Sequence, residues 1–285
     1  MPEGDTIFRS ARALGRALAG KPVTHFRSTF ALLTRFNDDS PLAGQTVSQV
    51  ESRGKWLLMH FSGGATLATH MLMSGSWHIY RPGERWQKPP FSMRIVVENS
   101  EYVAVGFNVP VAKMLSPDQL ERAVRIPGGE IDVLRSEFDA AEVTRRVLRC
   151  GDEEIGDVLL HQNVIAGVGN VFKSEICFVT ATHPFCKVRD LRGEQIALII
   201  ATARRLVKAN VMEDSGDTIV TYGGRQRRTT HESDPSASLW VYGRHRDGCR
   251  KCGEAIRKRL QAFDARVTFW CPKCQLMPDG TNIDG

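Results

Sequence analysis

Four cysteines near the carboxyl end are spaced as the ligands of a metal ion. Cys249 and Cys252 form one C-x2-C pair, Cys271 and Cys274 form a second, and 18 residues separate the two pairs. This spacing is typical of a closed, tetrahedral four-thiolate zinc site, which is structural rather than catalytic. Four unrelated thiols or a redox pair are the alternative. We therefore predict one structural Zn²⁺ on these four cysteines.

The chain begins Met-Pro-Glu-Gly, which could supply a nucleophile and an acid. Removal of Met1 would leave Pro2 with a free secondary amine. An α-amino group titrates near about 7.7–8.0, so much of it is neutral and nucleophilic at cellular pH. The adjacent Glu3 is placed to transfer protons. The alternative is a frayed chain end, with Glu3 acting only as an anion at a helix N-terminus.

Three other polar residues could contact phosphate groups. Lys55 lies in SRGKW at the start of a predicted strand, where a lysine can also simply keep a strand edge soluble. Asn170 opens a predicted helix after a GVG turn, and it is either an N-cap or part of an anion site. Arg266 lies in ARVTFW, which alternates as a strand does and leads into Cys271. A zinc-braced hairpin would hold this guanidinium rigidly, although an arginine there can also be merely solvated.

The elements expected in the first half of the chain would position Pro2, Glu3 and Lys55. Apolar residues at helical spacing follow the first residues, with Asp5 as the expected N-cap and Gly20 as the end of the helix. Residues from about 23 to 125 indicate mainly strands, including hairpins at the SGG and NS turns of KWLLMHFSGGATLATH and MRIVVENSEYVAVGF. Short strands with turns at this spacing predict a β-sandwich.

The second half of the chain is expected to be helical and then metal-bound. From 131 to about 212 the sequence predicts two short helices joined by VIAGVG and a longer third helix, and the polar, glycine-rich stretch 213–238 is predicted to be a mobile loop. The fold class is therefore α+β. We predict an amino-terminal β-sandwich domain flanked by helices over 1–126, a helical domain with its loop over 127–238, and a zinc finger over 239–285.

Composition and charge favour a polyanionic partner. The 285-residue chain carries a net charge of +6, and the segment from Thr221 to the end holds 12 lysines and arginines against 7 aspartates and glutamates. No apolar run is long enough to span a bilayer, and the first residues do not resemble a signal peptide. We expect an intracellular monomer with reduced thiols and no membrane partner. Cys150, Cys177 and Cys186 lack metal-ligand spacing and are expected to fill the core.

The motifs occur in an order that resembles the formamidopyrimidine-DNA glycosylase/endonuclease VIII family of DNA repair enzymes, from residue 2 to about 275. MPEG is similar to the opening of the endonuclease VIII branch rather than to the MPELPE of the formamidopyrimidine branch. RGKWLL resembles the family's lysine turn. HQNVIAGVGNVFKSEI resembles its helix–two-turn–helix motif, and ARVTFWCPKCQ resembles its zinc finger.

This resemblance implies a bifunctional DNA glycosylase/AP lyase that repairs double-stranded DNA containing damaged bases or abasic sites, in the bacterial cytoplasm and associated with the nucleoid. Pro2 would form a Schiff base with the sugar and cleave the strand by β- or β,δ-elimination, while Glu3 would protonate the sugar oxygen. Lys55 would contact a phosphate and could donate a proton. Asn170 and Arg266, the latter counted with the catalytic residues, would grip phosphates around a flipped base in a basic cleft between domains.

Some positions depart from the family pattern. HMLMSGSW corresponds to the hole-filling loop, with Met73 where the formamidopyrimidine branch has a methionine wedge and the endonuclease VIII branch has Gln-Leu-Tyr. A core methionine is the alternative. Thr6 stands where both branches usually have glutamate, and Asp5 could compensate. GFNVPVAKML lacks the arginine-phenylalanine loop of the formamidopyrimidine branch.

These features leave three functional interpretations. The opening and LWVYGR favour excision of oxidised pyrimidines, whereas Met73 favours oxidised purines such as 8-oxoguanine. The loop 213–238, which in this family can cap the flipped base, is long enough for either. The third interpretation is a non-catalytic zinc-ribbon protein that binds DNA and needs neither a processed Pro2 nor Glu3.

Overall fold

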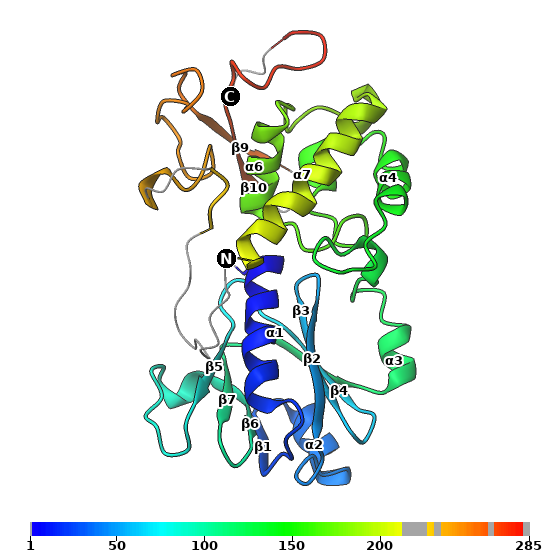
Figure 1. Cartoon of the computed structure of the whole chain (residues 1–285), viewed down its shortest axis with the longest axis vertical. Coiled ribbons are helices and arrows are strands. Elements are labelled where there is room, and N and C mark those ends of the chain that lie inside the picture. Colours follow the sequence, from blue (N-terminus) through cyan, green and yellow to red (C-terminus); the bar gives the residue numbers. More distant parts are fainter. Residues whose placement is uncertain (1, 213–226, 231–234, 262–264, 282–285) are drawn as a thin grey trace. The chain divides into compact units, whose positions relative to one another are not determined.

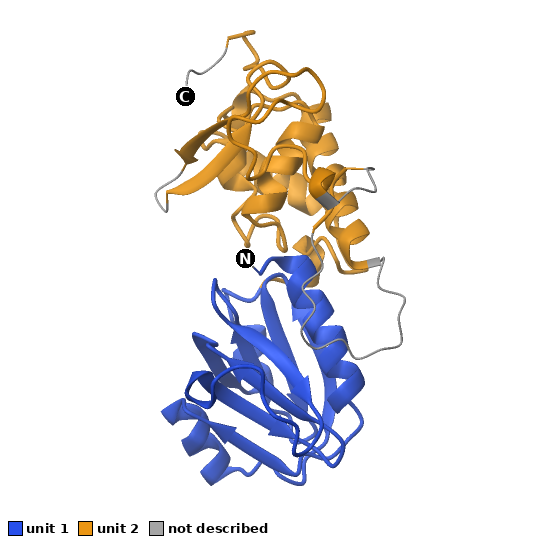
Figure 2. Cartoon of the chain, turned by 90° about the vertical axis from the view of Figure 1, so that its left-hand side faces the viewer, with its two compact units in different colours: residues 1–126, 214–224 blue, residues 127–213, 225–285 orange. Residues whose placement is uncertain are grey.

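The chain divides after Ile126 into two compact units (Figure 2). The computed structural model describes residues 2–212, 227–230, 235–261 and 265–281. Among these, residues 2–126 belong to unit 1 and the later ones to unit 2. Residues 239–285, predicted as a separate zinc finger, belong to the same unit as the helices that precede them. Much of the predicted loop 213–238 lies outside the described residues.

Unit 1 is built on two four-stranded antiparallel sheets, which confirms the β-sandwich (Figure 1). The strand orders are β1-β6-β7-β5 and β2-β3-β4-β8. Both expected hairpins are present, because β3 pairs with β4 across the SGG turn and β6 pairs with β7 across the NS turn. The strands are β1 (His25–Ser28), β2 (Val47–Arg53), β3 (Trp56–Phe61), β4 (Thr66–His70), β5 (Ser76–Tyr80), β6 (Met93–Glu98), β7 (Val103–Phe107) and β8 (Val111–Leu115).

The first helix, α1 (Gly4–Leu18), packs its apolar stripe into the core of unit 1. The buried stripe comprises Ile7, Ala11, Leu14 and Leu18, as the helical spacing predicts. The expected N-cap at Asp5 is wrong, since the cap position is Glu3 and Asp5 lies within the first turn. Gly20, with a φ of 76°, follows the C-cap residue Ala19 and turns the chain toward the sheet.

Two helices interrupt the region that was expected to be mainly strands. They are α2 (Ala31–Asp39) and α3 (Pro117–Glu121), and the short 3-10 helix η1 spans Pro90–Ser92. A reciprocal capping box between Ser116 and Gln119 explains where α3 begins. Leu33 is the only fully buried residue of α2. A helix with so small an apolar face has only a weak apolar periodicity in its sequence, which is why it was not predicted.

Unit 2 packs four helices around its own core and ends in a β-hairpin. The helices are α4 (Ala140–Arg149), α5 (Ile155–Val158), α6 (Asn170–Val179) and α7 (Gly193–Met212), with 3-10 helices η2 (Gly129–Ile131), η3 (Val188–Asp190) and η4 (Pro235–Ala237). The hairpin pairs β9 (Arg257–Gln261) with β10 (Arg266–Trp270). Of the described helices in either unit, none has the length and apolar character to cross a membrane.

Two of the three cysteines expected in the core are found there. Burial raises the pKa of Cys177 to about 12 and that of Cys186 to about 11, so both thiols are protonated at neutral pH. Cys150 differs, because it is only half-buried.

Candidate functional site

Glu3 is a fully buried carboxylate at the first turn of α1. Its side chain is 0% exposed, and although its backbone holds the N-cap position, its side chain makes no capping hydrogen bond. Pro2 precedes it and is half-buried. A carboxylate that is neither solvated nor used to cap its helix is costly to bury unless other groups stabilise it. Burial therefore argues against a frayed chain end.

Asp5 is also fully buried and lies beside the residue that departs from the family pattern. Its two carboxylate oxygens accept hydrogen bonds from the Thr6 hydroxyl and the Arg9 guanidinium, each at 3.3 Å. Thr6 is thus linked directly to an acidic group. This contact gives a physical basis to the prediction that Asp5 takes over the role of the family glutamate that Thr6 replaces. That role stays a prediction.

Lys55 lies in a tight turn rather than at a strand edge. The pairing of Arg53 with Trp56 leaves Gly54 and Lys55 as the two turn residues between β2 and β3. Gly54 has a φ of 57°, a conformation that glycine adopts without strain. The turn therefore fixes the backbone at Lys55.

His70 is a neighbour of Lys55 that the sequence did not single out. It pairs with Trp56 at the end of β4, and burial, together with the Lys55 ammonium, lowers the pKa of His70 to about 4. Its Nδ1 accepts a hydrogen bond from the Leu72 amide at 3.2 Å. His70 is therefore neutral at cellular pH and adds no charge that would repel Lys55.

Glu3 and Lys55 lie toward the same end of unit 1. A Cβ on Gly15 would lie 3.9 Å from Val50, and Ala19 bridges to Val47, so β2 runs toward the start of α1. The helix covers about 24 Å back to Glu3 at about 1.5 Å per residue. The strand covers a similar distance, about 20 Å at about 3.3 Å per residue, before the turn at Lys55. Figure 1 shows the start of α1 and the β2–β3 turn at the same end.

The loop that follows β4 leaves from this same end, because β3 and β4 are antiparallel. Its tip exposes two apolar side chains, Leu72 at 49% and Met73 at 63%. Met73 is therefore not a core residue. Leu72 has a φ of 44°, and Gly75 donates a backbone hydrogen bond to the Met71 carbonyl at 2.8 Å, so the loop is tightly folded. Leu72 is a second apolar residue at this tip that the sequence analysis missed.

In unit 2, α6 brings Asn170 next to the residue that follows Arg266. The Asn170 Nδ2 donates a hydrogen bond to the Val267 carbonyl at 2.9 Å, and its Oδ1 is buried without a hydrogen-bond partner in the described part of the chain. Arg266 is the first residue of β10 and is half-buried. The two predicted phosphate contacts are thus adjacent, one at a helix N-terminus and one at a strand end.

The turn before α6 is held by Gln162, which sequence reasoning did not identify. Its side-chain nitrogen donates to the Leu160 and Val168 carbonyls, both at 2.9 Å, while its oxygen accepts from the Gly167 amide at 3.1 Å. Gly167 has a φ of 95°. Gln162 thereby closes the turn that leads to Asn170.

Buried polar residues of α6 fasten the helix to the segment that carries the cysteines. The Glu175 carboxylate accepts backbone hydrogen bonds from Trp240, Val241 and Tyr242 at 2.8–2.9 Å. Lys173, which is 0% exposed, donates to the Thr268 hydroxyl of β10 at 2.6 Å. The sequence analysis did not single out either of these charged residues, because these partners lie at least 65 residues away along the chain.

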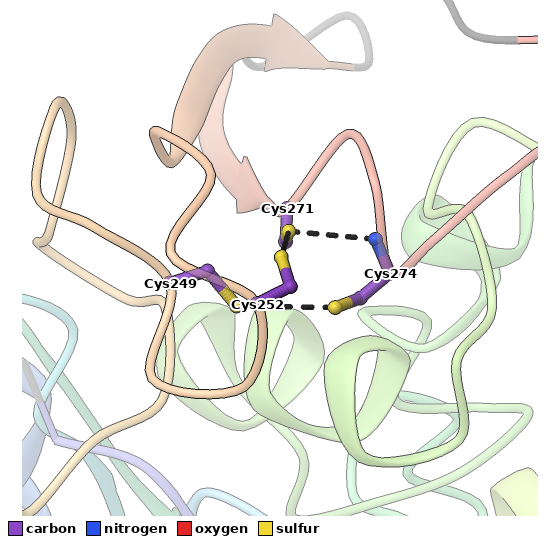
Figure 3. A group of neighbouring side chains, drawn as sticks. All are labelled: Cys249, Cys252, Cys271 and Cys274. Carbon is purple, nitrogen blue, oxygen red and sulfur yellow. Dashed lines mark hydrogen bonds between the residues drawn. The ribbon is translucent and has the colours of Figure 1, made fainter.

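The four predicted metal ligands converge (Figure 3). Their sulfur atoms all lie within 4.8 Å of one another, with 3.9 Å between Cys249 and Cys274 and 3.5 Å between Cys252 and Cys271. A tetrahedral ion with metal–sulfur bonds of about 2.3 Å needs sulfurs about 3.8 Å apart. Backbone amides at Lys251 and Cys274 donate to two of the sulfurs at 3.4 Å. The four cysteines could therefore hold one metal ion.

The fold and these sites define the chain as a member of the formamidopyrimidine-DNA glycosylase family. The family's N-terminal domain matches residues 1–108, and its H2TH domain matches residues 130–221. The chain is 36% identical to a probable endonuclease 8 2 of Streptomyces coelicolor, over 98% of this chain and 95% of that one. It is 32% identical to the DNA-(apurinic or apyrimidinic site) lyase Nei2 of Mycolicibacterium smegmatis, over 96% and 99%.

Solved structures show the same fold. A crystal structure of a mutant Lactococcus lactis FPG in complex with DNA containing Fapy-dG aligns with a TM-score of 0.78 at 22% identity, covering 96% of this chain and 99% of that one. A second structure, of the same organism's formamidopyrimidine-DNA glycosylase bound to DNA containing an AP site, aligns with a TM-score of 0.77.

Proposed function

We propose that this protein is a bifunctional DNA glycosylase/AP lyase of base excision repair, with Pro2 as its nucleophile. The observation that carries the proposal is the buried carboxylate of Glu3, which directly follows Pro2 and makes no capping hydrogen bond to α1. Lys55 belongs to a turn toward the same end of unit 1. An amine, an acid and a cation in this arrangement suit Schiff-base chemistry on a sugar.

The reaction assigned to these residues proceeds through the sugar C1′. The Pro2 nitrogen bonds to C1′ as the glycosidic bond breaks and the base leaves with a proton. Glu3 protonates the ring oxygen as the C1′–O4′ bond opens, which gives an iminium ion. Loss of a C2′ proton then expels the 3′-phosphate, a second elimination can expel the 5′-phosphate, and water releases Pro2 from the sugar.

Oxidised pyrimidines are the proposed substrates. The MPEG opening supports this choice, and so do curated relatives named endonuclease 8 from Salmonella at 30–31% identity. Excision of oxidised purines is a second candidate, favoured by Met73, whose exposed position at a loop tip suits a wedge that fills the space left by a flipped base.

Asn170 and Arg266 are proposed to bind phosphates of damaged double-stranded DNA. The amide of Asn170 has two N–H donors and uses one on Val267, and the first backbone amides of α6 add further donors. We propose that Zn²⁺ is the ion held by the four cysteines. It would supply a structural cross-link that keeps β10, and therefore Arg266, in place.

Borohydride trapping tests the proposal. Protein shown by mass spectrometry to lack Met1 is incubated with sodium borohydride and duplexes that carry an abasic site, thymine glycol or 8-oxoguanine. A covalent adduct that maps to Pro2 is expected on the abasic site and on thymine glycol. Stronger trapping on 8-oxoguanine than on thymine glycol would instead favour oxidised purines as the substrates.

Pro2→Gly separates catalysis from binding. This variant should bind an abasic-site analogue with much of the parental affinity and give little strand cleavage. If Pro2→Gly cleaves like the parent, the assigned nucleophile is wrong. If the parent without Met1 forms no adduct on any duplex, the protein is a DNA-binding module without this chemistry.

A further inference from the structure

A second group of metal-ligating side chains lies in unit 2, apart from the four-cysteine cluster. It consists of Cys150, directly after α4, Glu153 in the following turn, and His161, at the start of the turn that leads to Asn170. One ligand atom from each residue, a thiol sulfur, a carboxylate oxygen and an imidazole nitrogen, lies within 4.8 Å of the other two. None of these residues has a part in the proposed DNA chemistry.

One edge of this group has the length expected of a tetrahedral site. The His161 Nε2 lies 3.5 Å from the Glu153 Oε2. For metal–ligand bonds of about 2.0–2.2 Å, the edge of a tetrahedron is about 3.4 Å. The Cys150 sulfur lies within 4.8 Å of a ligand atom from each of these two residues. Its thiol now donates a hydrogen bond to the Arg146 carbonyl at 3.6 Å, and binding of a metal would replace that contact.

The backbone that carries the three residues is ordered by its own hydrogen bonds. The Glu153 amide donates to the Cys150 carbonyl at 2.9 Å, which closes a turn that brings the two side chains together. The His161 carbonyl accepts from the amides of Val164 and Ile165 at 2.9 and 3.0 Å. The ligands are therefore displayed from two fixed turns, and little backbone order would have to be created by binding.

We propose that Cys150, Glu153 and His161 form a second site for a borderline-soft divalent transition metal, of which Zn²⁺ is the usual representative. One thiolate, one imidazole and one carboxylate are all ligands of this ion, and three protein ligands leave a fourth position for water. Binding releases the thiol proton of Cys150 to solvent, and the carboxylate and thiolate charges balance the ion.

This site would join the end of α4 to the turn that precedes α6. Because His161 opens that turn, a bound ion would restrain its motion, and amides from Val164 to Gly167 should exchange with solvent more slowly in the metal-loaded protein. This effect does not depend on the proposed glycosylase activity, and its measurement needs no DNA.

Cobalt titration tests the site directly. The full chain, with its four-cysteine cluster loaded with Zn²⁺, is titrated with Co²⁺ while thiolate-to-cobalt absorption is recorded, and native mass spectrometry counts the ions retained. One additional Co²⁺ per chain is expected. Cys150→Ser and His161→Gln should each weaken the binding of this additional Co²⁺ by more than about 100-fold. Loss of a residue that only hydrogen-bonds to a metal ligand costs about 10- to 100-fold, and loss of a ligand should cost more.

Matched variants distinguish this site from surface binding. His25→Gln and Glu194→Gln change exposed residues of the same types elsewhere and should bind Co²⁺ as the parent does. Circular dichroism checks folding, and Glu153→Gln replaces any ligand variant that fails to fold. Absence of an additional ion in the parent, or equal Co²⁺ binding by Cys150→Ser and the parent, would overturn the proposal.

Discussion

At the scale of single residues, the proposed role of Glu3 as an acid can be tested with one conservative substitution. Glu3→Gln keeps the size of the buried side chain but removes the proton that we assign to opening the sugar ring. Schiff-base formation and strand cleavage should fall about 10²- to 10⁴-fold, the usual contribution of a positioned acid. Single-turnover strand cleavage of duplexes that carry an abasic site measures the effect, and circular dichroism checks that α1 is intact. Exposed Glu121→Gln is the control. Parental strand cleavage by Glu3→Gln would remove Glu3 from the mechanism.

Arg266 can be tested through the salt dependence of binding rather than through activity. Arg266→Ala removes one positive charge that we assign to a phosphate, so affinity should fall for every DNA sequence. The slope of log affinity against log salt should become shallower by about 1. Fluorescence anisotropy with an abasic-site analogue measures both quantities. Lys273→Ala, which changes an exposed charge within the second cysteine pair, should leave the slope closer to that of the parent.

At the scale of elements, the exposed loop after β4 depends on one glycine. A Cβ at Gly75 would lie 2.8 Å from the Met71 carbonyl oxygen and 2.9 Å from the Met71 Cα, and backbone atoms cannot move aside as a flexible side chain can. Gly75→Ala should therefore displace the tip that carries Met73 and cost about 1–3 kcal/mol of stability.

The functional readout of Gly75→Ala is base flipping. Fluorescence of 2-aminopurine placed beside an abasic-site analogue should report less unstacking by the variant than by the parent. Gly193→Ala is the matched control, because a Cβ there meets nothing within 4 Å. Normal unstacking by Gly75→Ala would show that this loop is not the wedge.

Local patterns predicted those elements whose signal lies within a few neighbouring residues. The two C-x2-C pairs, the SGG and NS hairpins and the stripe of α1 all have such signals, and the structure contains each of them. The N-cap of α1 was misplaced because aspartate is a preferred capping residue, whereas the observed N-cap, Glu3, makes no side-chain capping hydrogen bond. Contacts between distant residues left no local signal. The proximity of His70 to Lys55 and the use of Glu175 to hold the segment after residue 238 are examples.

At the scale of the whole molecule, each unit has its own hydrophobic core and its own histidines with a lowered pKa. In unit 1, burial lowers the pKa values of His70 and His78 to about 4, with help from Lys55 and Lys88. In unit 2, burial and then Arg259 do the same to His183. Both units should therefore lose stability in mild acid, although they need not unfold together.

His183 allows the sign and size of this effect to be measured in unit 2. It is 1% exposed, its Nδ1 accepts from the Phe185 amide at 3.3 Å, and its Nε2 has no partner within the described residues. Between about pH 6.5 and pH 4 the unfolded chain binds a proton that the folded chain excludes. The stability that neutral His183 contributes is thus complete above pH 6.5 and is lost as pH falls toward 4, by about 3 kcal/mol at most.

Hydrogen exchange of the most protected α6 amides at pH 7 and pH 5, corrected for intrinsic rates, measures this loss within unit 2. His183→Gln should show a smaller decrease between the two pH values than the parent, because glutamine cannot take up the proton. The variant's absolute stability at pH 7 does not enter this comparison. His25→Gln, in unit 1 and exposed, should behave like the parent. An equal decrease in His183→Gln and the parent would assign the acid sensitivity of unit 2 to other groups.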